Sequence, residues 1–159
     1  MVPGLPAPTP QQLLAPAQFL PTPLLETLIA RLARELLAEA IADGALDLLE
    51  HRLLAVHVTE PTLRLRFTLD DGQLRRGHAG PADVTITGRA EDLIRLAARR
   101  TDPDTLFFQR RLRLSGDTEL GLAVKNVLDT VALDALPRPI LSVLAHLADL
   151  AERQSPQVN

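Results

Sequence analysis

The sequence predicts one α+β domain, in which a largely antiparallel sheet has one solvent-facing side and one side covered by helices. Its length of 159 residues fits a single domain with flanking segments. Apolar and polar residues alternate through the middle of the chain, as is typical of half-buried strands. Before, within and after this region, apolar residues recur at helical spacing.

Five strands are expected. The clearest is TLRLRFTL, where Leu63, Leu65, Phe67 and Leu69 share one face and Arg64, Arg66 and Thr68 share the other. A hairpin signal, Asp70-Asp71-Gly72, follows this strand and predicts a return strand over 74–78. The remaining alternating runs predict strands over 54–58, 82–87 and 111–115.

The first helix is expected to begin with Thr22 as its N-cap and Pro23 at the first helical position, and to stop before Gly44. Its apolar pairs recur every four residues, so the apolar stripe drifts around the helix. Two interpretations stay open. The helix either lies across a curved core or turns one end of its apolar face toward something else.

Further helical segments are expected over 90–100, over 105–109 as a single turn, from about 117 onward, and over 140–153 as a C-terminal amphipathic helix. Residues 1–23 hold seven of the thirteen prolines, so only a short apolar turn, QQLLAPAQFL, is expected there. The chain therefore divides into a Pro-rich segment over 1–22, a main domain over 23–135, a helix over 136–153 and a tail over 154–159.

The composition argues against most catalytic and redox roles. There is no cysteine, and the four histidines lack metal-binding spacing. No serine lies in a nucleophile motif, and the acidic pairs flank Gly or Pro as turn formers do. We therefore expect no enzyme activity, no metal site and no cofactor. The N-terminus lacks the features of a signal peptide, and we expect a soluble cytoplasmic protein, with peripheral contact to the inner membrane left open.

Seven arginines gather on the predicted strands and at their ends: Arg64, Arg66, Arg75, Arg76, Arg110, Arg111 and Arg113. No aromatic side chains interleave with them, and the net charge is −3, so nucleic-acid binding is not expected. The simpler interpretation is a solvated face that protects the sheet edges. The alternative is a surface that binds an anionic headgroup or an acidic partner.

Two adjacent aromatic residues, Phe107 and Phe108, are half of the four phenylalanines in the chain. Neighbouring side chains on a helical turn diverge by about 100°, so both cannot point into one spot. One is expected to seal the core, and the other to line a cavity or its mouth. A core of Leu, Val and Ala suits an apolar pocket. The same composition suits a solid core, which composition alone favours.

The stretch DPDTLFFQRRLRLSGDTELGLAVKN, with ADVTITGRAEDLIRLAARRT before it and DGALDLLEHRLLAVHV further upstream, resembles the UbiT family of ubiquinone biosynthesis accessory factors. This family is built on a sterol carrier protein type 2 (SCP2-like) domain. The resemblance covers roughly residues 40–150. It implies a curved, mostly antiparallel five-stranded sheet, with helices on one face around an apolar cavity.

The resemblance also implies a non-catalytic role in oxygen-independent ubiquinone synthesis, in which the protein holds polyprenylated intermediates or membrane phospholipid. The implied partners are UbiU- and UbiV-type proteins, an iron–sulfur pair linked to anaerobic hydroxylation, and other enzymes of the pathway. On this hypothesis the lipid contacts are made by Leu54, Val56, Leu65, Phe67, Val84, Ile86, Phe107, Phe108, Leu112, Leu114, Leu120, Val124, Val127 and Leu128. The alternative is an interaction scaffold with a filled core and no bound lipid.

Overall fold

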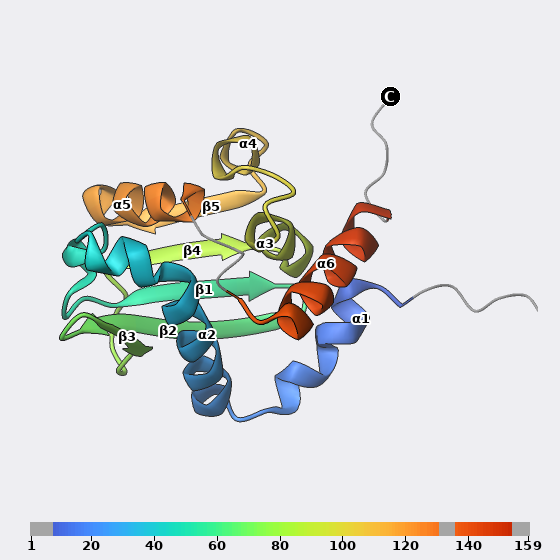
Figure 1. The fold of residues 1–159 in the computed structure, drawn as a ribbon, viewed down its shortest axis with the longest axis horizontal. Helices are drawn as coiled ribbons and strands as arrows, with labels where there is room; N and C mark the ends of the chain where they lie inside the picture. The colour runs from blue at the N-terminus through green and yellow to red at the C-terminus, as the bar shows by residue number, and fades with distance from the viewer. Residues whose placement is uncertain (1–7, 131–135, 154–159) are drawn as a thin grey trace, which may run out of the picture.

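The fold is a five-stranded sheet with order β3-β2-β1-β4-β5, seen in a computed structural model that describes residues 8–130 and 136–153 (Figure 1). The strands are β1 (Leu54–Thr59), β2 (Thr62–Asp70), β3 (Gln73–Arg76), β4 (Val84–Gly88) and β5 (Leu112–Gly116). Only the β1–β4 pair is parallel, and the three other pairs are antiparallel. The α+β prediction with five mostly antiparallel strands is confirmed. The predicted tail over 154–159 lies outside the described residues.

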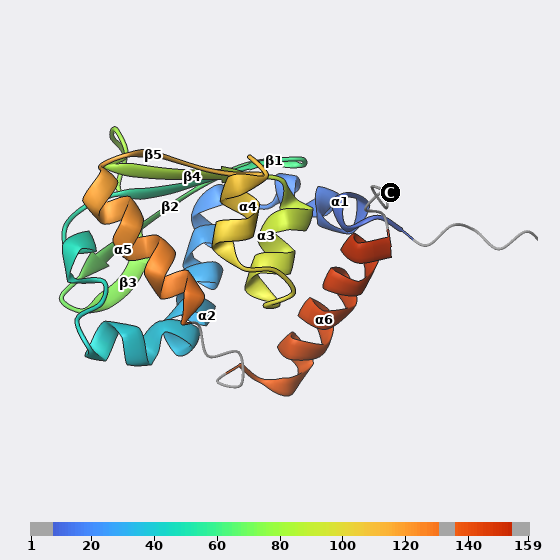
Figure 2. The same cartoon turned by 90° about the horizontal axis from the view of Figure 1, so that it is seen from above.

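The helices lie on one side of the sheet, as the view along its edge shows (Figure 2). Near the C-terminal ends of β1 and β4, α1 and α6 lie beside α3 (Figure 1). The helical elements are α1 (Pro10–Leu14), η1 (Ala15–Phe19), α2 (Thr22–Ala42), η2 (Asp47–Leu49), α3 (Ala90–Ala97), α4 (Pro103–Phe108), α5 (Thr118–Asp129) and α6 (Arg138–Arg153).

The strand register stacks apolar side chains in rows on the helix-covered face. One row runs from β2 to β5 through Leu65, Val56, Ile86 and Leu114. The next row contains Phe67, Leu54 and Val84. Because residues that pair across strands share a face, the alternation in each strand places its apolar half against α2 and α5. These residues form one continuous core.

One edge of the sheet is closed by α2. This helix packs along β3 and the adjoining part of β2. Beyond the end of β3, the buried carboxylate of Glu26 accepts a hydrogen bond from the Arg66 backbone N–H at 2.8 Å. A strand edge exposes unpaired backbone groups, and here a side chain from α2 takes the place of a neighbouring strand.

Three predicted helix starts are wrong by one or two residues. α6 begins at Arg138 rather than at residue 140. Pro21 is the N-cap of α2 and Thr22 is its first residue, so Pro23 takes the second helical position, which also needs no donor. The α4 turn begins at Pro103 because the Asp102 carboxylate accepts from the Thr105 backbone N–H at 2.8 Å. At the other end of α2, Gly44 has the expected positive φ of 77°.

A buried ion pair joins α3 to the start of β5. The Asp92 side chain is fully buried in the first turn of α3. Its Oδ2 accepts from Arg111 Nε at 3.2 Å. Its Oδ1 lies 2.6 Å from Arg111 Nη2, without the alignment of a hydrogen bond. A carboxylate without water around it depends on this guanidinium for its stability.

Arg111→Met therefore leaves an uncompensated buried charge and should lower the free energy of unfolding by about 2–4 kcal/mol. The measurement is urea denaturation of both proteins. Arg113→Met is the matched control, because Arg113 is exposed and makes no ion pair within the described residues. The double variant Arg111→Met/Asp92→Leu should regain part of the loss. If it is less stable than Arg111→Met alone, the ion pair is not the cause.

Candidate functional site

An apolar cavity of about 300 Å³ lies between the sheet and the helices. Every residue of the described chain that lines it is apolar. Protein interiors are normally close-packed by side chains, with few voids larger than a water molecule. A space of this volume is therefore a distinct feature of the core. Its walls are Ile29, Ala33, Leu36, Leu37, Leu46, Leu49, Leu54, Val56, Phe67, Leu74, Ile86, Ala97, Val124, Val127 and Leu128.

The periodicities of the elements explain how these walls form. α2 contributes Ile29, Ala33 and Leu37, which are four residues apart and follow one side of the helix. α5 contributes Val124 and Leu128 with the same spacing. Across the space, the sheet offers side chains from β1, β2 and β4. The side chains that α2 and α5 contribute are all aliphatic, and that of Ala33 is only a methyl group. These side chains therefore leave a space between the helices and the sheet.

The cavity reaches the surface at the end of α3, where Ala97 lines it and is exposed. Seven other lining residues are half-buried: Ile29, Ala33, Leu36, Leu37, Leu54, Val56 and Leu128. Among these, Leu128 of α5 also lines a surface hollow together with Leu96 and Arg99 of the α3 end. In the described part of the chain, we therefore place the mouth beside Ala97 and Leu128.

The predicted lipid-contact residues fall into four groups. Those that line the cavity are Leu54, Val56, Phe67, Ile86, Val124, Val127 and Leu128. Three others line a separate groove: Val84, Phe107 and Leu114. Buried in the core, but in neither lining, are Leu65, Leu112 and Leu120. Phe108 is 87% exposed. Lipid contact by any of these residues stays a prediction.

More than half of the lining was missed by sequence reasoning. These residues come mainly from α2 and from the segment around η2: Ile29, Ala33, Leu36, Leu37, Leu46, Leu49, Leu74 and Ala97. The drifting stripe of α2 was the available signal. Its four-residue spacing brings Ile29, Ala33 and Leu37, in the middle of the helix, against the cavity.

The separate groove lies between α4, α5 and β5, beside the edge of the sheet. Phe107 and Leu114 form its apolar part. At its polar part, Lys125 Nζ lies 2.7 Å from Asp104 Oδ1, and this hydrogen bond raises the pKa of Lys125. The Asp117 carboxylate accepts from the Leu120 backbone N–H at 2.8 Å as the N-cap of α5, which lowers the pKa of Asp117. These charges already have partners.

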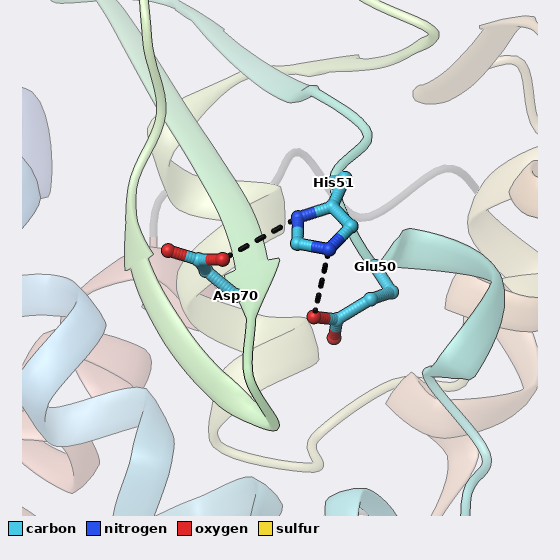
Figure 3. A group of neighbouring side chains, drawn as sticks. All are labelled: Glu50, His51 and Asp70. Atoms are coloured by element: carbon cyan, nitrogen blue, oxygen red, sulfur yellow. Dashed lines mark ion pairs between the residues drawn. The ribbon is translucent and has the colours of Figure 1, made fainter.

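A second cluster joins Glu50, His51 and Asp70 near the β2–β3 hairpin (Figure 3). His51 Nδ1 lies 3.3 Å from Asp70 Oδ1, and Nε2 lies 3.5 Å from Glu50 Oε1. The three groups offer ligand atoms within 4.8 Å of one another. In the observed contacts, however, the carboxylates face different ring nitrogens, and Glu50 Oε1 also accepts from the Asp71 backbone N–H at 2.7 Å. This arrangement ties the segment before β1 to the hairpin.

Apolar side chains are exposed along η1 and the N-terminal half of α2. Phe19 is 87% exposed, and Leu24, Leu28 and Leu32 form an exposed row along α2 at four-residue spacing. None of the described helices alone is long and apolar enough to cross a membrane. The segments 12–19 and 22–42, which meet at a 120° bend, pass the length and composition test only together.

Residues 29–129 match the model of the SCP-2 sterol transfer family, and this range contains the sheet and all fifteen of the cavity-lining residues. The chain belongs to the SCP-2 sterol transfer family. The resemblance stated from the sequence is thereby confirmed, as is the SCP2-like fold. In this SCP-2 domain the cavity lies between the helices and the covered face of the sheet.

The chain is also similar to individual proteins. The chain is 39% identical over 143 residues to the ubiquinone biosynthesis accessory factor UbiT of Escherichia coli strain K12, covering 90% of this chain and 82% of that protein. A protein of the same name from E. coli O157:H7 matches equally well. Among solved structures, the UbiJ-SCP2 ubiquinone synthesis protein has a TM-score of 0.56 at 24% identity, covering 68% of this chain and 96% of that one. That structure supports the SCP-2 fold alone.

The two adjacent phenylalanines should differ sharply in their contribution to stability. Phe107 packs against the core, so Phe107→Ala should lower the free energy of unfolding by about 1–3 kcal/mol. Phe108→Ala removes an exposed ring and should change it by less than about 0.5 kcal/mol. Thermal and urea denaturation measure both. Equal losses in the two variants would contradict the packing described here.

Proposed function

We propose that this protein is a non-catalytic lipid-binding accessory factor in ubiquinone biosynthesis, which holds a polyprenylated quinone intermediate or a membrane lipid for its partner enzymes. The observation that carries the proposal is the apolar cavity of about 300 Å³. Membership of the SCP-2 sterol transfer family and the likeness to UbiT, an accessory factor by name, support it.

Burial of an isoprenoid tail provides the driving force. Apolar surface gains about 25 cal/mol for each Å² removed from water, and a polyprenyl tail exposes several hundred Å². The cavity lies at the lower end of the range of about 300–1,000 Å³ typical of ligand pockets. It is therefore suited to one segment of a long tail. The polar ring would stay at the mouth, where another enzyme can reach it.

The cavity supplies no chemistry of its own. The residues of the described chain that line it are all apolar, which fits a binding role and gives none of them an acid–base or nucleophilic group. The chemical steps on the ring would belong to partner proteins. We propose UbiU- and UbiV-type proteins and other enzymes of the pathway as these partners, in its oxygen-independent branch.

Access to a membrane lipid requires contact with the membrane surface. We propose that the exposed row of Leu24, Leu28 and Leu32, with Phe19 before it, makes this contact. Apolar side chains on a helix bury themselves at the boundary between headgroups and acyl chains. The same helix also lines the cavity, which places the membrane contact and the binding site on one element.

Lipid extraction and mass spectrometry of the purified protein test the function. The wild-type chain should carry a quinone intermediate or a phospholipid. Leu128→Trp should fill the cavity and lower the bound lipid at least severalfold, because the added ring occupies the space at the mouth. Asn126→Trp, on the exposed side of the same helix, is the control and should keep its lipid. A wild-type protein without lipid would favour the scaffold with a filled core.

Membrane contact is tested by flotation with phosphatidylcholine–phosphatidylglycerol vesicles. Leu24→Ser/Leu28→Ser removes two exposed apolar side chains, each worth on the order of 1 kcal/mol of insertion free energy, and should weaken binding about tenfold or more. Leu122→Ser, which removes an exposed leucine from α5, should bind like the wild type. Equal binding by all three proteins would argue against contact through α2.

A further inference from the structure

The outer face of the sheet carries a patch of arginines that has no role in the cavity. One cross-strand row runs over four strands through Arg64, His57, Thr87 and Arg113. The row beside it contains Arg66, Ala55, Thr85 and Ser115, and Arg75 continues the face on β3. We call these nine residues the arginine face.

The arginines of this face are not neutralised. Among the described residues, no carboxylate lies within ion-pair distance of Arg64, Arg66 or Arg113, whereas eleven other ion-pair contacts form elsewhere. Arg66 donates to the His78 carbonyl oxygen at 3.5 Å, and Arg75 donates to Gln73 at 3.2 Å.

Acids at the ends of these strands have other partners. Asp83 and Asp117 both lie within ion-pair distance of Arg52. Asp70 contacts His51. Asp83 accepts from the Leu53 backbone N–H at 2.7 Å. Glu60 accepts from Arg89 at 2.9 Å. A cationic surface therefore persists on a chain whose net charge is −3.

No described helix covers the arginine face, because the helices lie on the opposite side of the sheet (Figure 2). Its floor is formed by short side chains, with Ala55 at 3% exposure beneath its longer neighbours. Arg64 and Arg113 lie at the two ends of the row that contains His57 and Thr87, about 14 Å apart by strand spacing. The sheet thus holds guanidinium groups on both sides of His57 and Thr87.

We propose that the arginine face is the docking surface for a partner protein with an acidic surface. Guanidinium groups form bidentate contacts with carboxylates, and a fixed spacing of such groups selects a matching pattern of acids. The inference rests on the proposed function, in which a partner enzyme must approach the loaded carrier.

The alternative occupant, an anionic membrane, fits less well. Every large exposed apolar side chain of the described chain comes from a helix or a turn, and none comes from the sheet. The arginine face has no apolar anchor to insert among lipid tails. A flat membrane that contacts α2 also leaves the opposite side of the sheet in the aqueous phase, where a protein can reach it.

Photo-crosslinking in cells that produce the full chain tests the proposal. Benzoylphenylalanine is placed at Thr87 in the centre of the face, and at Ser142, an exposed position on α6, as the comparison site. Thr87 should give a discrete protein adduct whose mapped site on the partner is rich in Asp and Glu. Arg64→Glu/Arg113→Glu should reduce that adduct about tenfold or more, and Arg64→Lys/Arg113→Lys should largely retain it.

The proposal is overturned if Thr87 gives no protein adduct, or if charge reversal leaves the adduct unchanged. Flotation with phosphatidylcholine–phosphatidylglycerol vesicles supplies the membrane arm. Arg64→Glu/Arg113→Glu should float like the wild type, and loss of flotation would assign the face to the membrane instead. The charge-reversed protein should also keep its bound lipid. The proposed function fails separately, if Leu128→Trp carries as much bound lipid as the wild type.

Discussion

The structure depends on the spacing between one face of the sheet and the helices that cover it. α2 and α5 meet the sheet with aliphatic side chains that leave about 300 Å³ between the layers. A cavity kept empty in a core costs roughly 24 cal/mol per Å³, so this space would cost on the order of 7 kcal/mol if nothing filled it. That is comparable to the whole stability of a typical domain, about 5–15 kcal/mol. On the proposed function, a bound apolar chain would restore the missing contacts and thereby raise the stability of the fold.

The strands and their faces could be predicted because alternation has a period of two and a one-residue slip would expose every apolar side chain. TLRLRFTL, for example, places Leu65 and Phe67 in the core as expected. The extent of the cavity could not be predicted. Whether Phe67 touches the opposite wall or faces a void depends on the distance between layers, which local periodicity does not encode. The walls from α2 and η2 were missed for this reason. Phe108 was expected at the cavity or its mouth from the divergence of neighbouring side chains on a helical turn and from the family resemblance, but it is 87% exposed and lies outside the cavity lining.

On the proposals made above, the two faces of the sheet have different roles. The covered face forms the cavity, and Glu26 closes the adjoining edge by bonding to the β2 backbone. The uncovered face carries arginines that strand register places in rows and that form no ion pairs among the described residues. The arginines and the apolar wall occupy alternate positions of the same strands. Substitutions on the outer face therefore need not alter the cavity wall on the other face. Each strand position faces one side only, and substitutions at alternate positions can act independently.

Helix α2 links the cavity to the outside most directly. Ile29 and Ala33 line the cavity, while Leu28 and Leu32, one position earlier, are exposed. Neighbouring positions on a helix differ by about 100°, so adjacent residues of one helix present a wall to the ligand and an apolar row to the surroundings. On the proposed function, a lipid that leaves the membrane beside this row has only the width of one helix to pass before it reaches the cavity. Among the described residues, α2 is held against the sheet by packing on β3 and β2 and by the hydrogen bond from the Arg66 backbone N–H to Glu26, so its position depends mainly on apolar packing.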